Sequence, residues 1–411
     1  MFDYRMPYSD PAFSGISLLG SMRKYSNRCR VQLVTATPNV STGDSTHDEN
    51  IRTLLEAHCP SLTDAKQACM KPTPFLRGGM LQSLYSTMRA LKRDKYSDIS
   101  YDRETKILSD GGTVSLDWYP ARGTDSADAR PVAIVMSGVG GSSYEYHIRC
   151  LSKTLGKDGA GYRVVVMNHR GMARTPLTSP KIYNASDTSD FCDIVKYIGT
   201  CCPNAPLLGV GFSLGANVLT KYLGEQGADS PLTAAVVICC PFDMSLTGRS
   251  LDADTFLNNN LYQPHLVATI KRFFQRNSEI LQNSPTNYDW DAIMKATRMS
   301  QIDTLVTARD YGQRDCWEHY RAASSTPYVD GIRTPYLAIN AMDDPVTRFE
   351  GIPQAKFRNN PHIALALLKH GGHLGFFCGL RPKIWYLTPL TEFFDAVLKH
   401  KSKAPQLTLA L

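Results

Sequence analysis

Residues 211–215 read Gly-Phe-Ser-Leu-Gly and lie between an apolar run at 207–210 and a helical stretch at 216–226. A serine on a sharp turn between a strand and a helix is typical of a nucleophile elbow, which presents the hydroxyl at the end of a sheet. The backbone at such a serine is strained, and only small residues fit two positions before and after it, which accounts for both glycines. For the five residues alone, a surface turn is the alternative. The strand before them and the helix after them favour Ser213 as a nucleophile.

The chain before the elbow alternates apolar runs with helical stretches. Residues 131–136 and 162–167 are continuous apolar runs, as expected of strands that are buried on both faces, and helical stretches follow at 146–156 and 188–200. This alternation predicts an α/β fold, with a mostly parallel sheet and helices on both of its faces. A hairpin at 101–118, which turns at a Gly-Gly pair, is expected to add two antiparallel strands.

The alternation of strands and helices breaks once and then resumes. After an apolar run at 232–239, residues 242–328 are rich in helical patterns and carry no strand signal, and a strand pattern returns at 336–340. Residues 72–82 contain several Pro and Gly residues and are expected to form an extended segment that wraps the core. These patterns divide the chain into a polar, partly flexible N-terminal arm, an α/β core in two pieces, a helical cap inserted after the sixth strand and a C-terminal tail: residues 1–50, 51–241 with 329–400, 242–328 and 401–411.

Two strands are expected after the cap, and each ends in a residue type that a serine nucleophile needs. The strand at 336–340 leads to Asp343-Asp344-Pro345, and the strand at 363–368 leads to His370-Gly371-Gly372-His373. In α/β-hydrolases the nucleophile, the acid and the histidine follow one another in this order along the chain. The order of these residues therefore supports a catalytic triad that begins at Ser213.

The predicted roles follow from the chemistry of such a triad. His373 would take the proton from Ser213, and Asp344 would orient the imidazole and stabilise its cation. Asp343 is the competing acid; because adjacent residues at a strand end point in opposite directions, only one of the two can serve. His370 is a second candidate base, but it lies closer to the strand and is expected to pack or cap there.

The loop after the strand at 131–136 reads Gly138-Val139-Gly140-Gly141 and is the predicted source of an oxyanion hole. One N–H group of such a hole comes from this loop, and the other comes from the residue after the nucleophile. We therefore predict that the backbone N–H groups of Val139 and Leu214 stabilise the oxyanion. A phosphate-binding loop is disfavoured because the required Gly spacing and Lys are missing, and a dinucleotide site lacks its acidic residue.

Composition argues against several other classes of function. The net charge of +7 is spread over the chain, with no basic block longer than residues 399–401, so nucleic acid is not an expected partner. Eleven cysteines without a C-x-x-C pair are typical of reduced thiols in an intracellular, cytoplasmic protein. We see no signal peptide and no transmembrane stretch, although peripheral membrane contact stays open. Histidines 362, 370 and 373 lie close together in the sequence, but their expected placement on a strand and a loop argues against a metal site.

Several separated blocks of this chain resemble one family within the α/β-hydrolases. The AB-hydrolase-4 family, which includes YheT-like proteins and the yeast medium-chain fatty acid ethyl ester synthase/esterases, is similar to this chain over roughly residues 50–399. The resemblance implies the triad Ser213, Asp344 and His373. Departures occur at Ser137, where the family often has His, and at Val139-Gly140, where Leu-Thr is usual. The blocks that carry the resemblance are 72–82, 101–118, 168–183, 211–217, 320–325, 339–345 and 370–373.

These observations together predict a serine-dependent hydrolase of carboxylic esters or thioesters, which works through an acyl–Ser213 intermediate. Members of the family it resembles act as ester hydrolases or as acyltransferases to alcohols, so acyl transfer from acyl-CoA or another thioester is the first alternative. A catalytically idle fold that binds a small molecule is the second. We expect no cofactor and no metal; the expected partners are small esters, thioesters or alcohols.

Overall fold

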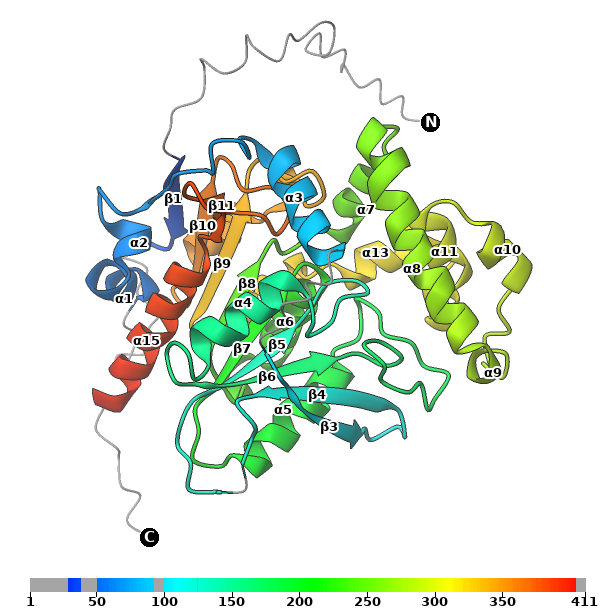
Figure 1. Cartoon of the computed structure of the whole chain (residues 1–411), viewed down its shortest axis with the longest axis horizontal. Coiled ribbons are helices and arrows are strands. Elements are labelled where there is room, and N and C mark those ends of the chain that lie inside the picture. Colours follow the sequence, from blue (N-terminus) through cyan, green and yellow to red (C-terminus); the bar gives the residue numbers. More distant parts are fainter. Residues whose placement is uncertain (1–28, 38–49, 92–98, 124, 404–411) are drawn as a thin grey trace, which may run out of the picture.

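A twisted sheet of ten strands, in the order β2-β1-β10-β9-β8-β7-β5-β6-β4-β3, forms the centre of the molecule (Figure 1). The structure is a computed structural model that describes residues 29–37, 50–91, 99–123 and 125–403. The central strands pair in parallel, and their Val-, Ile-, Leu- and Ala-rich sequences are buried on both faces. They are β5 (Val132–Met136), β6 (Arg163–Asn168), β7 (Leu207–Phe212), β8 (Leu232–Ile238), β9 (Tyr336–Ala341) and β10 (Ile363–Leu368).

Antiparallel strands complete both edges of the sheet. The predicted hairpin is formed by β3 (Asp102–Ile107) and β4 (Thr113–Tyr119), and β4 pairs with β6. At the other edge, β1 (Cys29–Thr35) pairs with β10, and the short β2 (Cys69–Met70) pairs with β1. A separate small ladder joins β11 (Phe377–Cys378) to β12 (Lys383–Ile384).

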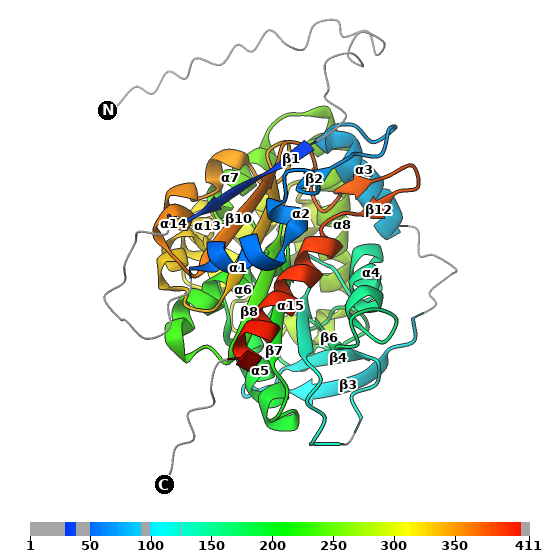
Figure 2. The same ribbon diagram turned by 90° about the vertical axis from the view of Figure 1, so that its left-hand side faces the viewer.

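Helices cover both faces of the sheet, and each face has its own apolar core. Figure 2 looks onto the first face, where α1, α2 and α15 lie in front of the strands. The helices of this face are α1 (Ile51–His58), α2 (Pro60–Thr63), α4 (Tyr146–Leu155) and α15 (Leu387–Lys403). Those of the second face are α5 (Ser189–Cys201), α6 (Leu214–Gln226) and α14 (Gln354–Asn359). The predicted α/β class, with a mostly parallel sheet between two helical layers, is therefore confirmed.

The regular elements of the segment between β8 and β9 are all helices, and the segment contributes no strand to the sheet. Its helices build a third apolar core, to which Leu177 and Ile182 from the loop between β6 and α5 also contribute. Figure 1 shows this segment as a layer beside the carboxyl ends of the parallel strands. Its α-helices are α7 (Met244–Asp252), α8 (Gln263–Arg276), α9 (Ser278–Leu281), α10 (Trp290–Lys295), α11 (Met299–Leu305), α12 (Thr307–Asp310) and α13 (Cys316–Ala323). We call residues 242–328 the cap.

The structure corrects three of the expected boundaries. Residues 1–50 are not all a polar arm, because β1 pairs with β10 from Val31 to Thr35; residues 1–28 and 38–49 lie outside the described part of the chain. Because β1 and β2 also join the sheet, the cap follows the eighth strand and not the sixth. At the C-terminus, α15 continues to Lys403, so residues 401–403 of the expected tail are helical.

The prediction that residues 72–82 form an extended segment is wrong for residues 79–82. Helix α3 (Gly79–Leu91) begins there, directly after Gly78 with its positive φ of 93°. Pro and Gly residues at the start of this segment concealed a helical stretch that continues well past them.

In the described ranges, no helix is long and apolar enough to cross a membrane.

Candidate active site

Ser213 lies on the turn between β7 and α6, with φ of 50° and ψ of −116°. Its N–H donates to the carbonyl of Ile238 at 3.0 Å, which fixes the turn to the neighbouring strand. A Cβ at Gly211 would lie 2.7 Å from the Ala216 Cα, and one at Gly215 would lie 2.5 Å from the Ser137 carbonyl oxygen. Any side chain at either position would therefore collide with backbone, which is the physical reason for the Gly-x-Ser-x-Gly spacing.

The structure brings Ser213, His373 and Asp344 together in one line of hydrogen bonds. The distance between Ser213 Oγ and His373 Nε2 is 2.9 Å, and that between His373 Nδ1 and Asp344 Oδ2 is also 2.9 Å. The three residues follow the carboxyl ends of β7, β9 and β10. In the sheet, β9 and β10 are neighbours, and β8 lies between β9 and β7. Ser213 and His373 are 160 positions apart in the sequence and thus meet at the carboxyl ends of the parallel strands.

Asp344 is buried and held by its own loop. Its carboxylate accepts hydrogen bonds from the N–H groups of Val346 and Thr347 and from the Thr347 hydroxyl. Burial alone would raise the pKa of Asp344, but His373 and the Thr347 hydrogen bonds hold this pKa below its ordinary value. The carboxylate is therefore ionised at neutral pH and is suited to orient an imidazole and stabilise its cation.

Asp343 points away from His373 and faces the other histidine. Its Oδ2 lies 2.9 Å from His370 Nδ1, and its Oδ1 accepts the N–H groups of Gly371 and Gly372 at 3.0 Å. His370 was expected only to pack or to cap the strand. In the structure, His370 and Asp343 form a second Asp–His pair beside that of Asp344 and His373. Asp343 and His370 hold the backbone of the loop that carries His373, so their geometry is that of positioning residues.

The two residues predicted to supply the oxyanion N–H groups, Val139 and Leu214, line the same cavity as Ser213. Leu214 is the first residue of α6, where a backbone N–H has no acceptor within its own helix. A Cβ at Gly138 would lie 3.2 Å from the Ser213 Cβ, so the loop that carries Val139 runs directly beside the serine. The role of Val139 and Leu214 as N–H donors to an oxyanion stays a prediction.

Helix α3 contributes to the site, and the sequence analysis missed it. Ser83 Oγ accepts the His373 N–H at 2.7 Å, and Ser86 Oγ donates to the Leu374 carbonyl at 3.0 Å. Gly79 packs so closely on the Asp343 carbonyl oxygen that a Cβ there would come within 1.9 Å of it. Serines three positions apart in a helical stretch share one face, which is the signal that could have revealed this contribution.

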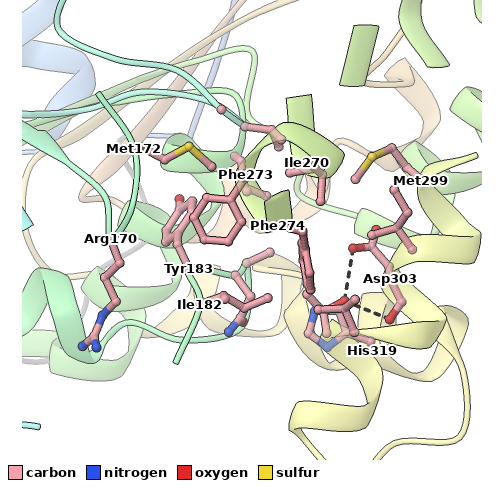
Figure 3. A pocket seen from close by; sticks show the side chains of 18 of the residues that line it. Arg170, Met172, Ile182, Tyr183, Ile270, Phe273, Phe274, Met299, Asp303 and His319 are labelled. Atoms are coloured by element: carbon pink, nitrogen blue, oxygen red, sulfur yellow. Dashed lines mark hydrogen bonds between the residues drawn. The ribbon is translucent and has the colours of Figure 1, made fainter. Parts of the chain in front are cut away.

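A cavity of about 240 Å³ opens beside Ser213 and His373, between the sheet and the cap. Ser83, Ser86 and Thr87 of α3 line one part of it, and Leu261, Tyr262 and Leu266 of the cap line another. A second cavity of about 120 Å³ lies farther into the cap, where Ile270, Phe273 and Phe274 surround it (Figure 3). The two cavities share six lining residues: Val139, Leu214, Met244, Met299, Asp303 and Tyr320.

Cys239 lies beside the triad at the end of β8. The Cys239 sulfur, one Asp344 carboxylate oxygen and one His373 ring nitrogen lie within 4.8 Å of one another, which is close enough for all three to bind one metal ion. Asp344 and His373 are hydrogen-bonded to each other, however, and the buried Cys239 thiol, whose pKa burial raises, accepts the Leu374 N–H. A metal here would have to displace the hydrogen bond between Asp344 and His373; the expectation of no metal stays a prediction.

Comparisons with known proteins agree with this geometry. A family model described as alpha/beta hydrolase fold matches residues 131–380. An abhydrolase domain-containing protein of Dictyostelium discoideum is 34% identical over 70% of this chain and 72% of its own length. Phospholipase ABHD3 of Homo sapiens is 28% identical over 88% of this chain and 85% of its own length. Medium-chain fatty acid ethyl ester synthase/esterase 2 of Saccharomyces cerevisiae is 28% identical over 82% of this chain and 87% of its own length. The predicted resemblance is confirmed: the chain belongs to the α/β-hydrolase fold family.

Proposed function

We propose that this protein hydrolyses carboxylic esters or thioesters through an acyl–Ser213 intermediate. The observation that carries the proposal is the unbroken line of hydrogen bonds from Ser213 through His373 to the buried, ionised Asp344. Relatives named for phospholipase and ester synthase/esterase activities support the ester class.

Each step of the proposed reaction is assigned to a residue of the candidate site. His373 Nε2 takes the Ser213 proton as Oγ attacks the carbonyl carbon, and the oxyanion forms between the Val139 and Leu214 N–H groups. His373 then returns the proton to the departing alcohol or thiol, which leaves the acyl group on Oγ. Water, activated by the same imidazole, releases the acid and restores Ser213.

A fluorophosphonate probe tests the first step directly. We expect the wild-type protein to react with the probe and to carry the adduct on Ser213, located by mass spectrometry of the digested protein. The reason is that such probes report a serine that is activated by a neighbouring base. A protein that stays unlabelled while its melting temperature shows an intact fold would favour the catalytically idle alternative.

The paired cavities suggest where an acyl chain would lie. The walls are mainly apolar, and Leu261 lines the cavity at Ser213 whereas Phe273 lines the deeper one. Phe256 of the cap lines neither cavity and is 80% exposed. An acyl chain that extends from Ser213 past the shared residues would gain about 0.8 kcal/mol for each methylene it buries.

Specificity should therefore depend on acyl-chain length. We expect kcat/KM for p-nitrophenyl esters from acetate to palmitate to rise to an optimum and then fall, because the two cavities are finite. Leu261→Ala and Phe273→Ala should move that optimum to longer chains. A flat wild-type profile, or variants that keep the wild-type optimum, would contradict a channel built by the cap.

Acyl transfer to an alcohol is the second candidate, since the yeast relative's name includes both synthase and esterase. The same residues would serve, with an alcohol in place of water at the acyl–Ser213 stage. Products formed from an acyl thioester with and without added ethanol separate the two: hydrolysis alone gives only the free acid, whereas transfer gives an ethyl ester at the expense of the acid.

A further inference from the structure

Helix α3 has its polar side chains turned inward and its apolar side chains turned outward. Gln82 and Ser83 are buried and bond to backbone inside the protein, whereas Met80, Leu81 and Met88 are between 40% and 54% exposed in the described part of the chain. A surface helix of a globular protein normally has the opposite arrangement, with its apolar stripe on the core. The outer face of α3 is therefore poorly suited to water and well suited to an apolar partner.

The hairpin of β11 and β12 extends this outer face. The Phe377 N–H of β11 donates to Gln82 of α3 at 2.6 Å, and β11 also forms a bridge to Pro72, so the hairpin and the segment 72–91 lie side by side (Figures 1 and 2). Leu380 at the turn of the hairpin is 84% exposed, and Phe75, just before α3, is exposed as well. We call the following residues the docking surface: Phe75, Met80, Leu81, Met88 and Leu380.

The charges around the docking surface have one sign. The segments 71–91 and 377–384 contain five basic residues and no Asp or Glu: Lys71, Arg77, Arg89, Arg381 and Lys383. Exposed apolar side chains among cations are suited to a lipid surface that contains anionic headgroups. A second copy of the chain is a poorer partner, because a two-fold contact would place the same cations opposite one another.

The docking surface lies on the helix that also lines the catalytic cavity. Ser83, Ser86 and Thr87 of α3 line the cavity that contains Ser213. We propose that α3 and the β11–β12 hairpin rest on the surface of an anionic membrane, so that a lipid substrate moves from the bilayer past α3 to Ser213. The passage of substrate rests on the ester hydrolysis proposed above, whereas membrane binding does not depend on it.

Co-sedimentation with vesicles tests the binding. The full chain with Ser213→Ala, which leaves the lipid intact, would be mixed with vesicles of phosphatidylcholine alone or with about one third phosphatidylserine. We expect the partition coefficient to be at least about tenfold higher on the anionic vesicles, because each basic residue near the surface adds to the attraction. High salt should weaken this binding, since it screens exposed charges.

Two double variants separate the charged and the apolar contributions. Arg381→Glu with Lys383→Glu should lower the partition coefficient on anionic vesicles by at least roughly thirtyfold. Met80→Gln with Met88→Gln should lower it by about tenfold, because less apolar area leaves water, while glutamine keeps the helix propensity of methionine. The melting temperature checks that each variant is folded.

Matched controls change the same residue types elsewhere. Lys196→Glu with Arg358→Glu reverses two exposed charges on α5 and α14 of the second face, and Phe256→Gln removes an exposed apolar side chain from the cap. Both should keep the binding of the Ser213→Ala protein.

No binding to anionic vesicles, unchanged binding in both double variants, or an equal loss in the controls would overturn the docking surface. A dimer that dissociates in the same double variants would instead assign the surface to a second copy. Vesicle binding by a protein that hydrolyses no ester would overturn the proposed function alone, and turnover of a water-soluble ester without vesicle binding would overturn the docking surface alone.

Discussion

Replacement of Ser213 by Ala is expected to lower kcat for ester hydrolysis by about six orders of magnitude, the size seen when a triad loses its nucleophile. The change removes Oγ, the atom that lies 2.9 Å from His373 Nε2. Alanine fits the turn, since the close approaches at the elbow involve Gly211, Gly215 and backbone and not the serine hydroxyl. The fold should therefore survive, and labelling by a fluorophosphonate should disappear.

The measurement is turnover of a p-nitrophenyl ester, with the melting temperature as the check on folding. A wild-type melting temperature together with the lost turnover assigns the effect to chemistry. Activity above a tenth of the wild-type value would mean that another residue, or water acting without Ser213, carries the reaction.

Asp344→Asn is expected to lower kcat by about four orders of magnitude. The physical reason is that Oδ2 of Asp344 accepts a hydrogen bond from the His373 Nδ1–H and stabilises the imidazolium that forms as Ser213 attacks. An amide there carries no charge, and it favours the wrong tautomer of the imidazole. Because Asp344 is also bonded to Thr347, the loop geometry should change little.

Asp343→Asn is the matched control, one position away and with the same chemical change. The side-chain oxygen of the introduced asparagine can still accept the Gly371 and Gly372 N–H groups, and its NH₂ group can face His370. We expect a loss of less than about tenfold, because these hydrogen bonds position the His373 loop and do not touch the reacting atoms. If Asp343→Asn were the more damaging change, the acid would be assigned to the wrong residue.

The central sheet and the order of Ser213, Asp344 and His373 could be predicted because they depend on local patterns. Buried parallel strands appear as continuous apolar runs, and each strand end carries its functional residue directly after it. Side-chain direction shows only that one of Asp343 and Asp344 can serve as the acid and does not say which one. The structure shows both aspartates paired, each with its own histidine.

Contacts between distant segments could not be predicted. β1 reads Cys-Arg-Val-Gln-Leu-Val-Thr, an alternating pattern that is itself typical of a strand, but only the structure shows that this strand pairs with the edge at β10. Likewise, the Ser83 hydroxyl becomes part of the site only when α3 meets the His373 loop.

The docking of α3 and β1 on the last strands also bears on how the chain is synthesised. Ser83 and His373 are 290 positions apart, so the early segment leaves the ribosome long before its partner is made. Loop closure over such a distance is entropically costly, and β10 must be present before β1 can pair. A nascent chain therefore contains its elbow serine well before His373 is made, and the hydrogen bond that activates Ser213 cannot form until the chain has been extended past that histidine.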